Sequence, residues 1–454
     1  MFGTFENFKN EMKGKKVTVA GIGVSNRPLI KLLAECGAEV TACDKKDYEK
    51  LGETAQEMES LGICLKTGDS YLSDIEGDYL FRSPGIRPDL PEFERFVEKG
   101  GVLTSEMEVF FDVCPIKIIA VTGSDGKTTT TTLISELLKS AGKRVHIGGN
   151  IGRPLLCDIP RFENGDIAVV ELSSFQLMTM KKSPSVAVIT NITPNHLDVH
   201  KSMEEYIRAK ENIMKHQNKD DILVLNYDNG ITKEIASRSA ANVLFFSRQS
   251  EADMYLENGV IYSEDEPVMR TSDIVIPGLH NVENYMAAYL AVKDIVSVRD
   301  LISVAGSFKG VEHRIEFVRE VNGVKFYNDS IASSPTRALA CLNAFIADGI
   351  KIRMIAGGYD KNIPFDELGA EIAQKVKKLY LCGNTAEKIK NAVRAAALDF
   401  PIAERESFKE ITELAYKESE PGDVIVLCPA CASFDKFANF VQRGNCYKQI
   451  VNEL

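Results

Sequence analysis

The chain has 454 residues, of which 44% are hydrophobic and 26% are charged, a balance typical of a globular protein with about three domains. Its formal net charge of −11 argues against a broad nucleic-acid-binding face, although a few local donors can still bind a small anion. No apolar run approaches the roughly 20 residues that cross a bilayer, and the N-terminus lacks a signal peptide. We therefore expect a cytoplasmic protein that binds neither membrane nor nucleic acid.

The first predicted domain, residues 1–105, opens with a β-α-β pattern of the nucleotide-binding type. An apolar strand at Val17–Ala20 leads into Gly21 and Gly23, and a helical stretch follows. The third glycine of the dinucleotide fingerprint is replaced by Asn26. An NAD-linked oxidoreductase is therefore a weak alternative, and another phosphorylated ligand at the first turn fits better.

Two polar strand ends follow in the same domain. The second strand of the β-α-β pattern ends at Asp44, and the later stretch "YLFRSPGIRPD" ends a strand in a turn. That turn contains Ser83, Pro84 and Gly85, and it could also be a plain Pro-Gly turn without function.

The central predicted domain, residues 106–310, carries a phosphate-binding pattern. An apolar strand at Ile116–Val121 feeds the loop "TGSDGKTTT", and a helical pattern follows. Backbone N–H groups of such a loop can face phosphate oxygens, while Lys127 pairs with the outer phosphates and the Thr128 hydroxyl binds Mg²⁺. Val121 stands where the usual pattern has its first glycine. The predicted ATP cradle comprises Gly123, Ser124, Asp125, Gly126, Lys127, Thr128 and Thr129.

Strands at "DIAVVEL" and "VAVITNI" alternate with helical stretches, which predicts a largely parallel sheet with its functional groups at the carboxyl ends of the strands. Glu171 could hold a metal or water there, or merely cap its strand. His196 and Asp198 follow the next strand, where a histidine can ligate a metal, although a lone histidine is more often an ordinary loop residue. Lys210 lies in a helical pattern whose spacing alone favours a solvated lysine.

Asn281 and Asn284 share one face of a predicted helix and could read a nucleotide base or cap the helix. In the third predicted domain, residues 311–454, Arg314 stands at the domain junction and could reach a phosphate when domains close. Asp329 ends the strand "VKFYNDS".

Further along the third domain, Lys361 and Ser433 follow two strands, an arrangement that suits a substrate with a carboxylate. Phe434 adjoins Ser433. Cys428 and Cys431 have C-x-x-C spacing, but no second pair completes a zinc site, so buried packing is the preferred interpretation.

Together these stretches resemble the Mur ligases. "TGSDGKTTT", "ELSSFQL", "NITPNHLD", "GLHNVEN", "EHRIEF", "YNDS" and "PACASFD" occur in the order of that family across essentially the whole chain. The resemblance implies an α/β fold with three domains: Rossmann-like, P-loop ATPase-type and again Rossmann-like. It further implies an ATP- and Mg²⁺-dependent ligase with two metal ions, of the branch that adds D-glutamate to UDP-N-acetylmuramoyl-L-alanine in cytoplasmic peptidoglycan precursor synthesis. A monomer is expected.

The resemblance also implies roles for single residues. It makes Lys127, Lys210, His196 and Arg314 catalytic, with Lys210 carbamylated. The metal ligands it implies are Thr128, Glu171, His196 and Lys210, and the nucleotide contacts beyond the loop are Asn281, Asn284, Arg314 and Asp329. The implied substrate contacts are Asp44, Ser83, Pro84, Gly85, Asn150, Ser173, Ser333, Lys361, Ser433, Phe434 and Phe440.

One departure from the family pattern concerns Ile331, which stands where a lysine is common in "NDSKAT". Two further alternatives stay open from the sequence. One is another member of the superfamily, such as a folylpolyglutamate synthase or a Mur ligase that adds a different amino acid. The other is a regulatory module that binds ATP without ligase chemistry.

Overall fold

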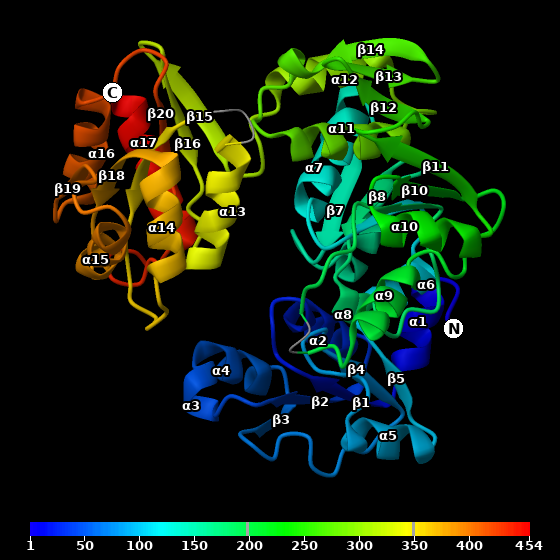
Figure 1. The fold of residues 1–454 in the computed structure, drawn as a ribbon. Coiled ribbons are helices and arrows are strands. Elements are labelled where there is room, and N and C mark those ends of the chain that lie inside the picture. Colours follow the sequence, from blue (N-terminus) through cyan, green and yellow to red (C-terminus); the bar gives the residue numbers. More distant parts are fainter. Residues whose placement is uncertain (197–198, 347–349) are drawn as a thin grey trace. The chain divides into compact units, whose positions relative to one another are not determined.

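The computed structural model of the chain describes residues 1–196, 199–346 and 350–454 (Figure 1). Its contacts divide the chain into two compact units. The first unit contains Met1–Met269 and Asn284–Leu301, and the second contains Arg270–Glu283 and Ile302–Leu454. Among the described residues, no helix has the length and apolar character needed to span a membrane.

The first sheet lies in the first unit and has five parallel strands in the order β3-β2-β1-β4-β5. The strands are β1 (Lys16–Ala20), β2 (Glu39–Asp44), β3 (Cys64–Thr67), β4 (Tyr79–Arg82) and β5 (Val102–Thr104). The helices are α1 (Phe5–Met12), α2 (Asn26–Glu35), α3 (Tyr48–Leu51), α4 (Glu53–Ser60) and α5 (Pro91–Glu98). The strand order reverses between β1 and β4, and ligands of open α/β sheets bind outside the carboxyl ends of strands at such a point.

The second sheet, also in the first unit, has nine strands in the order β14-β13-β12-β11-β10-β9-β6-β8-β7. The strands from β7 to β12 in this order are parallel, and β12 and β13 form an antiparallel pair. The strand bounds are β6 (Lys117–Thr122), β7 (Val145–Gly149), β8 (Ile167–Glu171), β9 (Val186–Ile189), β10 (Ile222–Asn226), β11 (Asn242–Ser247), β12 (Met254–Glu257), β13 (Val260–Ser263) and β14 (Glu266–Arg270).

The continuous apolar runs in the sequence fit the parallel part of this sheet, because parallel strands are usually covered on both faces. All five residues of β8 are buried. The accompanying helices are α6 (Glu106–Val113), α7 (Lys127–Ser140), α8 (Ser174–Leu177), α9 (Met203–Glu211), α10 (Gly230–Ile235), α11 (Leu279–Leu290) and α12 (Val298–Ser307), with 3₁₀ turns η1 (Leu156–Arg161), η2 (Ala236–Arg238) and η3 (Thr271–Asp273).

The third sheet lies in the second unit and has six strands in the order β15-β16-β20-β17-β18-β19. Only the β15 and β16 pair is antiparallel among them. The bounds are β15 (Glu316–Val321), β16 (Val324–Asn328), β17 (Ile352–Ala356), β18 (Val376–Leu381), β19 (Ile402–Glu404), β20 (Val424–Leu427), α13 (Pro335–Ile346), α14 (Asp366–Lys375), α15 (Ala386–Ala396), α16 (Phe408–Lys417) and α17 (Phe440–Glu453). The predicted α/β class is confirmed by these three sheets, whereas the predicted boundaries after residues 105 and 310 stay predictions.

Candidate active site

The loop between β6 and α7 has the backbone of a phosphate cradle. Gly126 precedes the first residue of α7 with φ of 78°, and Gly123 has φ of 152°. A Cβ on Gly123 would collide with the Thr190 hydroxyl, and one on Gly126 would collide with the Asn284 amide oxygen. Both positions therefore need glycine, and the positive dipole end of α7 at its N-terminus favours an anion there.

We expect Gly126→Ala to weaken ADP binding about tenfold, because the methyl group would displace Asn284 and strain the loop. Calorimetric titration with ADP measures the effect. Gly142→Ala is the matched control, since Gly142 has a similar φ of 74° and a Cβ added there would meet no atom within 4 Å. If both variants bind ADP like the parent protein, Gly126 does not shape the nucleotide site.

Lys127 begins α7 and folds back over the loop. Its Nζ donates to the carbonyl oxygens of Gly123 and Ser124, each at 2.9 Å. The loop is also fastened to the end of β9, because the Asn191 side chain accepts from the Asp125 N–H at 2.9 Å and the Thr190 hydroxyl donates to the Asp125 carbonyl. An ammonium group thus lies at the mouth of the cradle, where phosphate oxygens would sit.

Thr128 and Glu171 meet at the carboxyl ends of β6 and β8. The Thr128 hydroxyl donates to one Glu171 oxygen at 2.7 Å, and the Asn150 amide donates to the other at 2.7 Å. Glu171 is buried at the end of its strand. These three predicted residues form one polar cluster beside the loop, with oxygen donors of the type that Mg²⁺ prefers.

Lys210 lies on α9 with only 1% of its surface exposed. Its Nζ donates to the Gly123 carbonyl at 2.7 Å and approaches the Thr122 hydroxyl at 3.3 Å. Burial, reinforced by the positive charge of Lys127, lowers the pKa of the Lys210 amine well below its ordinary value. The prediction of a solvated lysine, which spacing alone favours, is therefore wrong, because the side chain points into the loop.

His196 is exposed, with φ of 54°, and its ring contacts Phe175 edge-on with centroids 5.3 Å apart. Asp198 lies outside the described residues. His200 is buried, stacks on the Phe175 ring and approaches the Ser174 hydroxyl at 2.9 Å through Nε2. The sequence assigned no role to His200, and the structure packs it against Phe175, whose ring also contacts His196.

Asn284, on α11, reaches the loop from a distant part of the chain. Its amide oxygen accepts from the Thr130 hydroxyl at 3.1 Å and lies next to Gly126. Asn281 instead donates to the Pro277 carbonyl at 2.5 Å, at the beginning of the same helix. Thr129 lies half-buried on the first turn of α7.

The predicted substrate contacts of the first domain gather at the carboxyl ends of β1, β2 and β4. The Asp44 carboxylate accepts from the Ile22 N–H at 2.8 Å and from the Lys46 N–H at 2.9 Å. The Ser83 N–H donates to the Ala20 carbonyl at 2.8 Å, and a Cβ on Gly21 would lie 2.8 Å from the Ser83 Cβ. The glycine turn and the Ser83–Ile86 turn are thus packed together at the point where the strand order reverses.

Pro84 is half-buried in this turn and Gly85 is exposed. Asn26, which replaces the third fingerprint glycine, is buried and donates to the Gly21 carbonyl at 2.9 Å. It therefore braces the glycine turn from inside. Ser173 is the N-cap of α8, with a reciprocal pair of hydrogen bonds to Gln176. Its hydroxyl is accordingly engaged in holding the helix end.

In the second unit, Asp329 follows β16 and is buried. Its carboxylate accepts from the Ile315 N–H at 3.2 Å and lies within 4.8 Å of the thiols of Cys341 and Cys428. Burial raises the pKa of this carboxyl to about 7. The observed contacts make Asp329 a brace for the His313–Ile315 turn, next to the exposed Arg314.

Because the folded-state pKa of Asp329 lies above its ordinary value of 3.8, the folded state binds more protons between about pH 4 and pH 7. The protonated Asp329 carboxyl therefore stabilises the folded state below this pH window, and this stabilisation is lost as the pH rises through the window. Relative to Asp329→Asn, the wild-type free energy of unfolding should fall with rising pH, by about 4 kcal/mol at most. Urea unfolding of both proteins at pH 4.5 and 7.5 measures this, and a constant difference would contradict it.

Ser333 and Lys361 line one shallow depression in the second unit, together with Tyr359, Ile363 and the Ala430–Ala432 segment. Phe434 is exposed and its ring meets that of Tyr359 edge-on at 6.0 Å. The depression thus brings together an ammonium group, a hydroxyl and aromatic rings, of which the first two can pair with a carboxylate.

Ser433 lies on the segment before α17, and Phe440 is the first residue of that helix. The Arg443 side chain holds the segment in place. The buried Arg443 donates to the carbonyls of Cys431 and Ala432 at 3.0 and 3.2 Å, and to Ser330 through two further bonds. The Phe440 carbonyl accepts from the Ser330 hydroxyl at 2.7 Å. Burial lowers the pKa of Arg443 to about 10.

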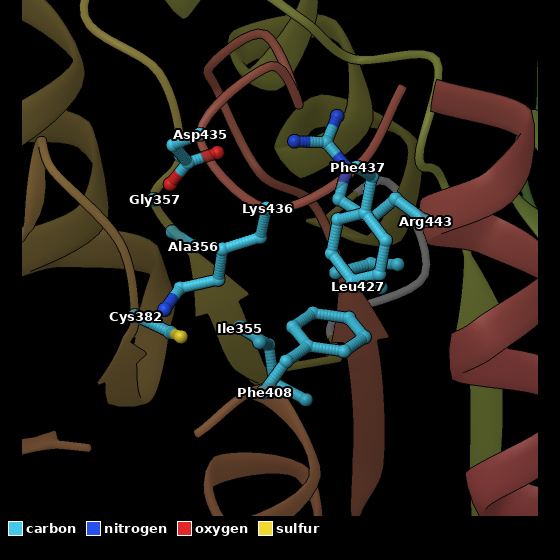
Figure 2. Close-up of a pocket in the computed structure, with 11 residues that line it drawn as sticks. Ile355, Ala356, Gly357, Cys382, Phe408, Leu427, Asp435, Lys436, Phe437 and Arg443 are labelled. Atoms are coloured by element: carbon cyan, nitrogen blue, oxygen red, sulfur yellow. The ribbon is translucent and has the colours of Figure 1, made fainter. Parts of the chain in front are cut away.

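A second pocket in this unit is lined partly by that segment, through Lys436 and Phe437, and also by Phe408 and Arg443 (Figure 2). Figure 2 shows Asp435 beside Gly357, away from the two aromatic rings. Cys428 and Cys431 are both buried free thiols, in agreement with the expected packing role. Sequence reasoning missed Arg443, because a charged residue in a helical pattern is normally solvated and Lys448 and Glu453 stand in the same helix.

Comparison with known proteins supplies a family context for these features. The Mur ligase middle domain matches residues 121–292, and the Mur ligase, glutamate ligase domain matches residues 313–431. The UDP-N-acetylmuramoylalanine–D-glutamate ligase of Acetivibrio thermocellus is 53% identical over 466 residues, covering 99% of this chain and 98% of that protein. The enzyme of the same name from Clostridium kluyveri is 50% identical over 457 residues, covering 99% of both chains.

Solved structures share the fold at low sequence identity. The UDP-N-acetylmuramate–alanine ligase of Thermotoga maritima superposes with a TM-score of 0.58 at 17% identity, covering 97% of this chain and 99% of that one. The MurF ligase of Thermotoga maritima, solved in complex with ADP, gives a TM-score of 0.56 at 17% identity, covering 98% and 97%. These likenesses confirm the predicted arrangement of α/β domains and show the fold alone.

Proposed function

The chain belongs to the Mur ligase family, and we propose that it is the member that joins D-glutamate to UDP-N-acetylmuramoyl-L-alanine with ATP. The observation that carries this proposal is the 53% identity, over essentially the full length, to a ligase of that name. The cradle at the N-terminus of α7, with Lys127 over its mouth, supplies the chemistry that such a ligase needs.

A carboxylate is a poor acyl donor at neutral pH, so it must first receive a good leaving group. One oxygen of the L-alanyl carboxylate attacks the γ-phosphorus, ADP departs, and an acyl phosphate forms. The neutral amine of D-glutamate then attacks the acyl carbon, loses a proton, and the tetrahedral intermediate expels inorganic phosphate. Lys127, aided by Arg314, offsets the repulsion between the two anions in the first step.

Mg²⁺ fits the cluster beside the loop, where it would neutralise phosphate charge. Thr128 and Glu171 already present a hydroxyl and a carboxylate 2.7 Å apart. His196 would add a ring nitrogen and Lys210 a carbamate oxygen. A lysine amine cannot ligate a metal while protonated, but its neutral form adds to CO₂ with loss of one proton. Burial of Lys210 favours that neutral form.

The remaining substrate groups take the two sites described above. The uridine diphosphate lies at the turns around Asp44 and Ser83–Ile86, and Asn150 faces the sugar-peptide end. D-Glutamate occupies the depression at Ser333 and Lys361 in this proposal. Ser433, Phe434 and Phe440 are its further proposed contacts. Asn281, Asn284, Arg314 and Asp329 serve the nucleotide, directly or by positioning. In this proposal the protein acts as a cytoplasmic monomer of three domains, with boundaries after residues 105 and 310.

The experiment that tests the proposal is product formation with a panel of amino acids. The protein is incubated with ATP, Mg²⁺ and UDP-N-acetylmuramoyl-L-alanine, and the product mass is measured with D-glutamate, L-glutamate, L-lysine or meso-diaminopimelate. We expect one amide product, with D-glutamate only. A product with another amino acid would move the chain to a different branch, and nucleotide binding with no product would favour the regulatory module.

A further inference from the structure

Arg82 is a buried arginine at the end of β4, directly before the Ser83–Ile86 turn, and only 1% of its surface is exposed. A buried guanidinium is costly unless its donors are paired, so its partners reveal what it holds in place. No role was predicted for it from the sequence.

One terminal nitrogen of Arg82 pairs with its own turn. Nη1 donates to the Ile86 carbonyl at 3.1 Å and lies 3.5 Å from the Pro84 carbonyl. These contacts tie both sides of the turn to one rigid, planar group. The turn itself contacts Gly21 through Ser83, so its position also sets the shape of the glycine turn after β1.

The other terminal nitrogen has its partners outside the first sheet. Nη2 donates to the Phe175 carbonyl at 2.8 Å and to the Thr179 hydroxyl at 3.0 Å. Thr179 in turn donates to the Glu108 carboxylate at 3.0 Å, and Glu108 also accepts from Ser105. A buried cation and a buried anion are therefore bridged by one hydroxyl, across the end of β4, the α8 segment and α6.

We infer that Arg82 is a positioning residue that holds the Ser83–Ile86 turn at a fixed place relative to α8 and thereby sets the affinity for the uridine-diphosphate substrate. The inference rests on the proposed function, since it assumes that the turn binds that substrate. Only a planar fork with donors on two sides can serve both elements, so lysine cannot replace it. The ring of Phe175 contacts both His196 and His200. Arg82, through the Phe175 carbonyl, therefore connects the Ser83–Ile86 turn to the segment that carries His196.

The test compares Arg82→Met, Arg82→Lys and Thr179→Val. Arg82→Met removes all four contacts, Arg82→Lys keeps the charge without the fork, and Thr179→Val cuts the link to Glu108 while leaving the turn contacts. Arg95→Met is the matched control, because Arg95 is an exposed arginine on α5 that forms an ion pair with Glu92 on the same helix. Melting temperatures are recorded for every variant.

Calorimetry with UDP-N-acetylmuramoyl-L-alanine gives the dissociation constant, and steady-state kinetics give the KM values. We expect Arg82→Lys and Arg82→Met to raise the dissociation constant about tenfold or more, with the KM for D-glutamate changed less than about threefold. Thr179→Val should give a smaller rise, and Arg95→Met none. A purely structural role predicts a lower melting temperature with unchanged substrate affinity.

The inference is overturned if Arg82→Lys folds and binds the uridine substrate like the parent protein. It is also overturned if the KM values for ATP, D-glutamate and UDP-N-acetylmuramoyl-L-alanine all rise together. Should Arg82→Met fail to fold, Arg82→Lys and Thr179→Val still decide. If the wild-type protein itself does not bind the substrate, the proposed function fails and this inference falls with it. If the wild type binds and the variants bind equally well, only the inference fails.

Discussion

Replacing Lys127 with alanine should lower kcat by about a thousandfold, because the loop would lose the cation that faces the transferred phosphoryl group in the proposed mechanism. In the observed structure the Lys127 ammonium lies between two loop carbonyls, 2.9 Å from each. It can therefore turn from these oxygens to phosphate oxygens without moving the backbone. Initial rates of ADP release and amide formation, measured at saturating substrates, give the effect on kcat.

Lys139→Ala is the control for this change. Lys139 lies in the last turn of the same helix, and its ion pair with Glu136 is largely exposed. Exposed pairs of this kind contribute little, so the rate should stay unchanged. Circular dichroism and binding of UDP-N-acetylmuramoyl-L-alanine confirm that Lys127→Ala is folded. A folded Lys127→Ala protein with wild-type kcat would refute the assignment of the loop.

Lys210→Met should lower kcat by about a hundredfold and raise the Mg²⁺ concentration needed for half-maximal rate. Methionine preserves the apolar stem of this buried side chain but cannot form a carbamate, so one proposed metal ligand is lost. The wild-type protein equilibrated with ¹³C-labelled CO₂ should show one carbamate resonance that is absent from Lys210→Met. Depleting CO₂ should slow the wild-type enzyme and leave the variant unchanged.

The matched control is Lys215→Met, since Lys215 is an exposed lysine just beyond α9. It should retain the wild-type rate, Mg²⁺ dependence and carbamate resonance. Wild-type kcat in Lys210→Met would remove Lys210 from the metal site. A normal carbamate resonance in that variant would place the modification on another amine.

The elements around the loop could be predicted because local patterns decide them. The apolar run at Ile116–Val121 becomes β6 (Lys117–Thr122), and the two glycines that follow meet the steric demands of a sharp turn. The helical pattern around Lys210 likewise becomes α9 (Met203–Glu211). A continuous apolar run predicted the buried strand and a helical pattern predicted the helix, and both agree with the tertiary environment.

Other features of the site depend on residues far apart in sequence and left no local pattern. Arg82 contacts Phe175, 93 residues away, and nothing in "YLFR" indicates that its arginine is buried. Spacing also failed for Lys210, because a lysine in a helical pattern is normally solvated and only the tertiary fold brings it to Gly123. Asp329 follows its strand as expected, but its burial next to Cys341 and Cys428 depends on where α13 packs.

The central claim is that the loop around Lys127 serves phosphoryl transfer to the carboxyl end of the uridine substrate. UDP-N-acetylmuramoyl-L-alanine labelled with ¹⁸O in the alanyl carboxylate tests it directly, by mass measurement of the phosphate released during synthesis with D-glutamate. The oxygen that attacks phosphorus leaves with the phosphate when the amide forms, so each phosphate should carry one ¹⁸O from a fully labelled carboxylate. Phosphate without ¹⁸O, formed in step with the amide product, would contradict the account.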